Sequence, residues 1–284
     1  MNLNDPNILC RDHPDYRFRE SGHIRPLFSL EGKKCVITGA AGGIGRSTSK
    51  AFAELGGDVC LIDIPAKEER LQEICSAIEK EFGVRAIYAT GDVSDEESVL
   101  NCVEKAAADL GTIDVCHSNA GVVQLDNSPD VDVKEFKRIL DINLVGMMLV
   151  SRACANIMKR GGHGGSIILT ASQSGHIVNC DWKDGDFGYA YHVSKAGVLH
   201  LAHSMALDYI KYGIRVNSIS PGVVLSGIHD PVPVKLMQSS LGKIPIGHFG
   251  YLQDIASTVA FLATDLSAFC VGTDIIVDGG ETLY

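Results

Sequence analysis

Short runs of β-branched residues alternate with longer stretches of helical period through most of this 284-residue chain. The short runs are apolar on both faces, which is typical of strands whose sheet is covered on each side. They predict strands at residues 35–39, 58–63, 85–92, 113–121, 166–172, 214–222 and 274–280. The stretches between them predict helices at residues 46–55, 68–82, 96–110, 133–158, 189–212 and 253–264.

This alternation predicts the fold class. Strands joined by right-handed helical crossovers form a parallel sheet with helices on both faces. We expect one α/β domain at residues 31–284, doubly wound in the Rossmann manner, with a seven-stranded parallel sheet. Residues 1–30 are expected to form an N-terminal extension. Residues 222–250 carry prolines and glycines where a short connection would suffice, so they are predicted to form a lid over a substrate.

Composition excludes several classes of protein. The formal net charge of −10 argues against a general nucleic-acid binder, which needs a basic surface. The N-terminal residues lack the apolar core of a signal peptide, and no run approaches the roughly 20 apolar residues of a membrane span. The nine cysteines show no zinc-ligand spacing, which favours reduced thiols. We therefore expect a cytoplasmic protein with no metal and no nucleic-acid or membrane partner.

A glycine-rich turn joins the first predicted strand to the first predicted helix. Gly39, Gly43 and Gly45, with Ile44 between the last two, lie where the backbone must bend and approach a pyrophosphate. The following helix offers free amides and a positive dipole to that anion. Such a run is also found in ordinary tight turns, but its place between a strand and a helix favours a dinucleotide site.

An acid ends the second predicted strand, at the distance where dinucleotide-binding proteins receive the ribose hydroxyls. The carboxylate of Asp63 would repel a 2′-phosphate, and Ile64 beside it offers no guanidinium. NAD is therefore the expected cofactor. Lys67 nearby leaves NADP open, and a solvated acid at a strand end is the alternative interpretation.

The third and fourth predicted strands also end in polar or small residues. In open α/β sheets, ligands bind outside the carboxyl ends of the strands. Asp92 and Val93 are therefore predicted to border the adenine half of the dinucleotide. The ribose and nicotinamide half is predicted to lie against Asn119, Ala120 and Gly121. Taken alone, either group could be a helix cap or a turn.

A tyrosine and a lysine lie four positions apart near the start of a long predicted helix. Tyr191 and Lys195 share one helix face, and a nearby cation favours the phenolate, which brings the phenol within reach of proton transfer. Ser172 ends the preceding strand, where its hydroxyl could bond a substrate oxygen. Asn143 lies inside a predicted helix, where asparagine is mildly unfavourable; it either bends the helix or holds a water beside the lysine.

These motifs, taken in order, resemble the classical short-chain dehydrogenase/reductase family. The matching set is Thr38-Gly39-x-x-x-Gly43-x-Gly45, Asp63, Asp92, Asn119-Ala120-Gly121, Asn143, Ser172, Tyr191-x-x-x-Lys195 and Pro221-Gly222. The resemblance covers about residues 30–284. It implies that Tyr191 is the general acid and base and that Lys195 lowers the pKa of Tyr191 and holds the nicotinamide ribose. It also implies that Ser172 orients the substrate oxygen and that Asn143 anchors a proton-relay water.

The same resemblance extends to cofactor contacts and assembly. Pro221, Gly222 and Val224 would border the nicotinamide amide, with Ser226 where the family usually has threonine. The family also implies a homo-oligomer, a tetramer built partly from the predicted helices 133–158 and 189–212.

Residues 172–179 and 277–284 are similar to the polyol dehydrogenase and ketose reductase branch, which includes mannitol, arabinitol and sorbose enzymes. The expected function is therefore hydride transfer between NAD and a secondary alcohol or ketone, with a polyol or sugar as the small-molecule substrate. Ser174, His176 and Asn179 are candidate substrate contacts, although His176 and Asn179 serve equally well as loop residues. The insertion at 180–188 adds Trp182 as a fourth candidate; a solvated acidic loop is the alternative.

Two other functions remain open. A hydroxysteroid dehydrogenase or a 3-oxoacyl reductase uses the same scaffold, since specificity resides in the lid and the insertion. A non-catalytic NAD-binding protein is disfavoured, because it would not need Asn143, Ser172, Tyr191 and Lys195 together.

Overall fold

A parallel seven-stranded sheet forms the centre of the molecule in the computed structural model, which describes residues 23–123, 131–178, 188–226 and 241–283. The strands are β1 (Lys34–Thr38), β2 (Asp58–Asp63), β3 (Ala86–Thr90), β4 (Val115–Ser118), β5 (Gly165–Thr170), β6 (Ile214–Pro221) and β7 (Asp274–Val277). Their order across the sheet is β3-β2-β1-β4-β5-β6-β7, and every pairing is parallel. The predicted single doubly wound α/β sheet is confirmed.

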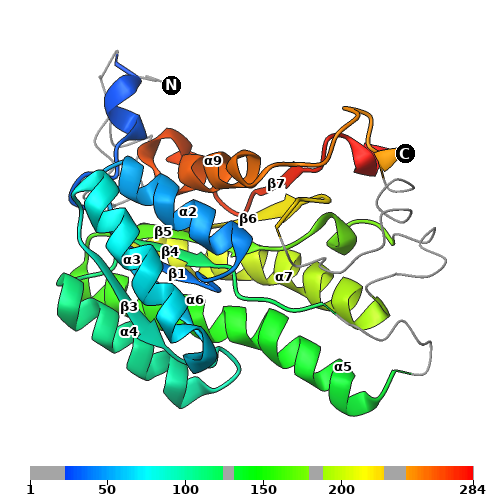
Figure 1. Ribbon diagram of the computed structural model, residues 1–284, viewed down its shortest axis with the longest axis horizontal. Coiled ribbons are helices and arrows are strands. Elements are labelled where there is room, and N and C mark those ends of the chain that lie inside the picture. The colour runs from blue at the N-terminus through cyan, green and yellow to red at the C-terminus, as the bar shows by residue number, and fades with distance from the viewer. Residues whose placement is uncertain (1–22, 124–130, 179–187, 227–240, 284) are drawn as a thin grey trace, which may run out of the picture.

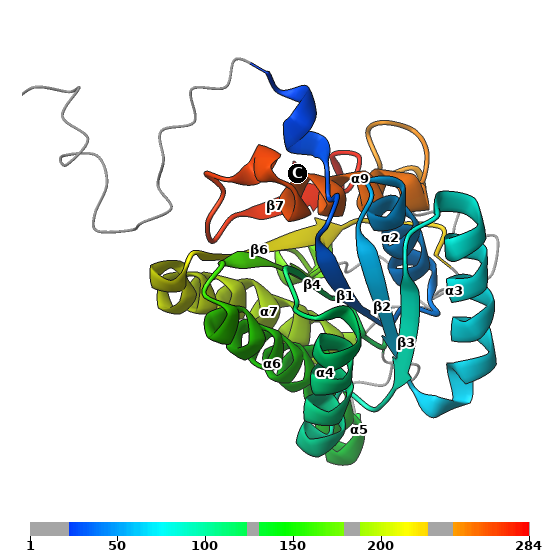
Figure 2. The same ribbon diagram turned by 90° about the vertical axis from the view of Figure 1, so that its left-hand side faces the viewer.

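Helices cover both faces of this sheet (Figures 1 and 2). One face carries α2 (Gly43–Glu54), α3 (Glu68–Phe82) and α9 (Leu252–Ala263). The other carries α4 (Glu96–Leu110), α5 (Val133–Leu140), α6 (Gly146–Gly161) and α7 (Gly188–Tyr209). Each layer buries its own apolar cluster against the sheet, which explains why the strands are apolar on both sides.

The helix predicted at 133–158 is confirmed as one unbroken helical stretch, Val133–Gly161, which contains a π turn that the sequence pattern does not predict. This π turn, η3 (Asp141–Val145), lies between α5 and α6, and the amide of Gly146 donates to the carbonyl of Asp141, five residues back. The whole stretch Val133–Gly161 is long and apolar enough to cross a membrane by composition alone. In this fold 56% of its apolar window is buried, as in a core helix.

The carboxyl ends of the strands gather the predicted site residues at one edge of the sheet. The chain runs outward from β1 through β2 to β3 and then crosses back to β4 on the other side of β1, so the direction of winding reverses between β1 and β4. Ligands of doubly wound sheets bind at such a reversal. Strand β4 ends at Ser118 and β5 at Thr170, earlier than predicted, so Asn119 and Ser172 lie in the loops beyond them.

The predicted extension and lid fall partly outside the described residues. Residues 1–22 and 227–240 lie there, whereas residues 25–28 form a short 3-10 helix, η1 (Arg25–Phe28). At the two ends of the predicted lid, Val224 pairs with Gly250 in an isolated parallel bridge. The seven described cysteines are all free, and six of them are buried.

Candidate active site

The turn between β1 and α2 is too crowded at three positions for any residue larger than glycine. Gly39 has a φ of 63°, and a Cβ atom there would lie 2.9 Å from Cα of Ala120. A Cβ atom on Gly43 would lie 2.3 Å from the carbonyl oxygen of Ser226. One on Gly45 would lie 2.3 Å from the carbonyl oxygen of Gly39. Glycine therefore lets the loops after β1, β4 and β6 meet at the start of α2.

The first turn of α2 offers backbone amides to an anion. Gly42 is its N-cap, and no described side chain caps the helix. The amides of Gly43, Ile44 and Gly45 therefore have no helical carbonyl to bond, and the helix dipole adds a positive potential there. This backbone cradle fits the pyrophosphate of a dinucleotide.

Asp63 is held beside this cradle by two backbone amides. Its Oδ2 accepts a hydrogen bond from the amide of Ala41 at 2.9 Å, and its Oδ1 accepts one from the amide of Ile64 at 2.9 Å. The carboxylate is thus fixed at the end of β2, on the side of the glycine turn. This is where an acid receives the ribose hydroxyls of a bound dinucleotide.

Asp92 and Val93 lie beyond the end of β3. Asp92 is exposed, and its Oδ1 accepts hydrogen bonds from the amide and the hydroxyl of Ser94 at 2.9 and 2.7 Å. Val93 packs against the first residue of α6, because a Cβ atom on Gly146 would lie 3.0 Å from its Cγ2. Both residues border the small cavity of about 10 Å³ that also touches Thr38 and Ile62.

The loop after β4 is locked to the end of β1. The hydroxyl of Thr38 accepts hydrogen bonds from the amides of Asn119 and Ala120 at 3.0 and 3.1 Å. In return, Nδ2 of Asn119 donates to the carbonyl of Thr38 at 3.0 Å. These three bonds hold residues 119–121 at the reversal of the sheet.

Asn143 ties this loop to the helix that carries the tyrosine and the lysine. It is fully buried in the π turn; its Oδ1 accepts from the amide of Val122 at 2.8 Å, and its Nδ2 donates to the carbonyl of Val122 at 2.9 Å. Nδ2 also donates to the hydroxyl of Ser194 at 3.0 Å. A Cβ atom on Gly121 would lie 3.3 Å from Oδ1 of Asn143 and 3.4 Å from Nζ of Lys195. Asn143, Gly121 and the ammonium of Lys195 therefore lie close together in the fold.

Tyr191 and Lys195 share one face of α7, as their spacing predicts. The Nζ atom of Lys195 lies 5.6 Å from the centroid of the Tyr191 ring. It donates a hydrogen bond of 2.8 Å to the carbonyl of Thr170, the last residue of β5. Ser172, two residues further on, hydrogen-bonds Tyr191. The serine hydroxyl, the phenol and the ammonium thus converge at the end of β5.

Burial shifts the pKa values of both titratable groups toward their neutral forms. It raises the pKa of Tyr191 above the usual value, and the hydrogen bond with Ser172 opposes that rise. It lowers the pKa of Lys195 to about 7. A phenolate and an ammonium in one buried site stabilise each other, so this pair is suited to exchange a proton with a bound oxygen atom.

The loop after β6 closes the cofactor side of the site. Pro221 ends β6 beside Val277 of β7, and the amide of Gly222 donates to the carbonyl of Val277 at 2.9 Å. Val224 is buried, and the amide of Ser226 donates to the carbonyl of Val224 at 2.8 Å. Because the Ser226 carbonyl approaches Gly43, this loop reaches the glycine cradle.

The structure describes two of the four candidate substrate residues. Ser174 is buried in the 3-10 turn after β5, and its amide donates to the Ser172 hydroxyl at 3.1 Å. His176 bonds through Nε2 to Asp274 at 2.9 Å and to Ser220 at 3.2 Å, which favours the loop role for this histidine. Asn179 and Trp182 lie outside the described residues.

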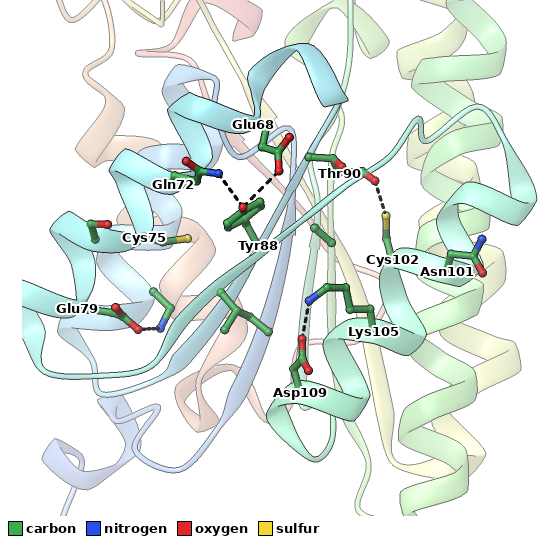
Figure 3. Close-up of a pocket in the computed structure, with 14 residues that line it drawn as sticks. Glu68, Gln72, Cys75, Glu79, Tyr88, Thr90, Asn101, Cys102, Lys105 and Asp109 are labelled. Carbon is green, nitrogen blue, oxygen red and sulfur yellow. Dashed lines mark hydrogen bonds and ion pairs between the residues drawn. The ribbon is translucent and has the colours of Figure 1, made fainter.

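A cavity of about 640 Å³ lies along the outer edge of β3, between α3 and α4 (Figure 3). None of the predicted site residues lines it. Its polar side chains bond one another: Tyr88 accepts from Gln72 at 2.8 Å and donates to Glu68 at 3.3 Å, and Lys105 pairs with Asp109 at 2.6 Å. This pairing is typical of a surface groove rather than a catalytic site.

Two residues of the site have no signal in the sequence pattern. Thr170 is the carbonyl acceptor for Lys195, and its hydroxyl donates to Oδ1 of Asn119 at 3.1 Å. The hydroxyl of Ser194 accepts a hydrogen bond from Nδ2 of Asn143 and donates one to the carbonyl of Tyr191 at 2.7 Å. Both act through contacts between segments far apart in the chain, which residue spacing does not reveal.

The fold and the site together define a dinucleotide-binding α/β protein with a tyrosine and lysine pair at the carboxyl edge of its sheet. Comparison with known proteins identifies the family. A family model described as enoyl-(acyl carrier protein) reductase matches residues 39–282. Among solved structures, a short-chain type dehydrogenase/reductase from Mycobacterium marinum has a TM-score of 0.87 and 35% identity, covering 92% of this chain and 100% of that one. The chain belongs to the short-chain dehydrogenase/reductase family.

Two curated relatives show which branch it is similar to. A sorbose reductase of Candida albicans is 34% identical over 267 residues, covering 92% of this chain and 90% of that protein. An NADP-dependent mannitol dehydrogenase of Hypocrea jecorina is 33% identical over 264 residues, covering 92% and 97%. The predicted similarity to the polyol dehydrogenase branch is confirmed.

Proposed function

We propose that this protein is an oxidoreductase that transfers a hydride between NAD and a secondary alcohol or ketone of a polyol or sugar. The observation that carries the proposal is the convergence of Ser172, Tyr191 and Lys195 at the end of β5. The ammonium of Lys195 lies beside Gly121, and the loop that contains Gly121 borders the proposed nicotinamide position. A protein that only bound a dinucleotide would not need a buried phenol and a buried ammonium there.

The residues divide the reaction among them. When bound, the nicotinamide ring accepts or supplies the hydride. In the oxidising direction, the Tyr191 oxygen takes the proton of the substrate hydroxyl as the hydride leaves its carbon atom. The Ser172 hydroxyl hydrogen-bonds the same substrate oxygen and so orients the substrate. The Lys195 ammonium stabilises the phenolate, and in the reducing direction Tyr191 returns the proton to the carbonyl oxygen.

NAD is the proposed cofactor, although the mannitol dehydrogenase relative is named as NADP-dependent. Support comes from Asp63, whose two oxygens are anchored by Ala41 and Ile64, so the carboxylate cannot easily turn away from a 2′-phosphate. We expect kcat/KM to favour NAD in the wild type. Replacing the acid in Asp63→Ser should raise kcat/KM for NADP relative to NAD by about tenfold, the effect of removing about 1.4 kcal/mol of repulsion. Equal preference in both proteins would contradict the role of Asp63.

The substrate class is tested with purified protein and a panel of compounds. The panel holds mannitol and other polyols with NAD, sorbose and related ketoses with NADH, a hydroxysteroid, and a 3-oxoacyl thioester. We expect the highest kcat/KM with a polyol or ketose, and a loss of at least about tenfold for an analogue that lacks one hydroxyl group. A faster reaction with the steroid or the thioester would overturn the substrate class while keeping the reaction type.

An acyl substrate is the second candidate, because the matching family model carries an acyl-carrier-protein reductase description. Ser172 would orient the reacting oxygen of either substrate, so the two classes differ in the long apolar chain that only the acyl substrate brings to the entrance of the site. The thioester arm of the panel decides between the two classes.

We further propose a cytoplasmic homotetramer. The family resemblance suggests this assembly, and large apolar side chains are exposed on the described surface, Leu207 of α7 at 77% and Phe269 before β7 at 94%, which an interface between copies would bury. Light scattering coupled to size-exclusion chromatography tests the state: a mass of four chains is expected, and a monomer at micromolar concentration would contradict it.

A further inference from the structure

A histidine is fully buried in the middle of the sheet, where the proposed reaction has no use for it. His117 lies in β4, in register with Ile37 of β1 and Ile168 of β5. An imidazole enclosed by aliphatic side chains costs free energy unless its nitrogens are bonded. The contacts of His117 therefore explain what it does there.

A directed chain of hydrogen bonds leads from this histidine to the site. Nε2 of His117 lies 2.9 Å from the hydroxyl oxygen of Thr170, and that hydroxyl donates to Oδ1 of Asn119 at 3.1 Å. A hydroxyl has one proton, so Thr170 can only accept from His117, which must carry its proton on Nε2. Nδ1 then bears the lone pair, and it has no partner within the described part of the chain.

Burial keeps the imidazole in this neutral form. It lowers the pKa of His117 to about 3, so the ring is uncharged throughout the range in which enzymes of this kind are assayed. With the proton on Nε2, the histidine is a permanent donor to Thr170 rather than a group that titrates. Its effect on the site is therefore geometric and constant.

Thr170 connects the two layers of the protein. Side chains alternate along a strand, so Thr170 lies on the same face of the sheet as Ile168, which belongs to the apolar cluster under α2 and α9. The backbone carbonyl of Thr170 accepts a hydrogen bond from the ammonium of Lys195, and this lysine belongs to α7 on the opposite face of the sheet. Whatever fixes the Thr170 side chain also fixes the carbonyl that holds the lysine.

We infer that His117 is a positioning residue of the active site, which acts through Thr170 to hold both the carbonyl acceptor of Lys195 and the amide of Asn119. The kinetic part of this inference rests on the proposed function, whereas the coupling between His117 and Lys195 is a property of the free protein. The two parts can be tested separately.

Two substitutions of similar size separate the hydrogen bond from the packing. His117→Gln can place an amide N–H near the position of Nε2, and His117→Leu keeps the volume but removes the donor. Val115→Ala is the matched control: Val115 lies on the same face of β4, two residues earlier, and is buried in the same apolar cluster without a bond to Thr170. Melting temperatures of all three are measured so that any loss of folding is accounted for.

The free protein is tested first, by lysine side-chain NMR, with Lys195→Met used to assign the signal. A less well held carbonyl stabilises the ammonium less, so we expect the pKa of Lys195 to fall by about half a unit in His117→Leu and to stay near the wild-type value in His117→Gln and Val115→Ala. An unchanged pKa in His117→Leu, or an equal fall in Val115→Ala, would overturn the inference whether or not the protein proves to be a dehydrogenase.

The kinetic arm uses the best substrate of the panel. We expect kcat to fall about tenfold in His117→Leu, because this variant loses the hydrogen bond to the Thr170 hydroxyl. The loss should be less than about threefold in His117→Gln, which can keep that bond. The acid limb of the pH profile of kcat/KM should move to higher pH in His117→Leu alone. Equal losses in the Leu and Gln variants would show that His117 only fills space. If the wild type oxidises no alcohol, the proposed function fails, and the NMR result still decides the coupling.

Discussion

The two halves of the site differ in which groups form them, backbone in one and buried side chains in the other. At the ends of β1 and β2 the chain uses backbone: glycines that permit close approach, and helix amides that remain free. At the ends of β4 and β5 it uses buried side chains, with Asn143, Thr170 and Lys195 bonded across three segments. A backbone half tolerates no added atom, whereas a side-chain half tolerates no lost partner. The following predictions test that difference, from the largest effect to the smallest.

The backbone half should fail when one carbon atom is added. In Gly45→Ala the new Cβ would lie 2.3 Å from the carbonyl oxygen of Gly39, so the turn must open. Overpacking costs about 1–3 kcal/mol, and we expect the Kd for NADH to rise by about tenfold to a hundredfold. Fluorescence titration with NADH measures it.

Gly42→Ala is the matched comparison. Its Cβ would lie 3.3 Å from the same carbonyl oxygen, which requires a shift of only a few tenths of an ångström. We expect a clearly smaller rise in Kd. Equal effects of the two substitutions would show that the close approach at Gly45 is not what forms the cradle.

The side-chain half should fail when one partner is removed. Asn143→Ala leaves the amide and the carbonyl of Val122 without their bonds, and we expect a loss of about 2–3 kcal/mol in the free energy of unfolding, together with a fall in kcat of about tenfold. Urea denaturation and steady-state kinetics measure the two effects. Asn156→Ala, in α6 and away from the site, should change neither. If kcat in Asn143→Ala equals that of the wild type, Asn143 has no role in catalysis.

The buried lysine should cost stability in a pH-dependent way. The pKa of Lys195 is lowered from 10.5 to about 7, so the unfolded chain binds more protons between these values and wild-type stability rises with pH across that window. Lys195→Met removes the buried charge. We expect its melting temperature to exceed that of the wild type by a few degrees at pH 6 and the difference to shrink toward pH 9. A difference that is constant from pH 6 to pH 9 would contradict the depressed pKa.

The sequence predicts the backbone half better than the side-chain half, for a physical reason. Glycine spacing and the four-residue step from Tyr191 to Lys195 are local, and the structure places them as expected, although β4 and β5 end earlier than predicted. The π turn at Asp141–Val145 inserts one residue into a helix without disturbing its apolar pattern, so the pattern does not reveal it. Thr170 acts only through neighbours brought together by the parallel register, and no local signal marks it.

The central claim concerns the Tyr191 hydroxyl, and one substitution removes only that group. In Tyr191→Phe we expect kcat to fall by about 10²–10⁴-fold, the usual contribution of a positioned acid and base, while the Kd for NADH stays within about threefold of the wild type. Tyr189→Phe, on the exposed side of the same helix, is the control and should be fully active. If Tyr191→Phe retains most of the wild-type kcat, the phenol is not the proton carrier and the assignment of the active site is wrong.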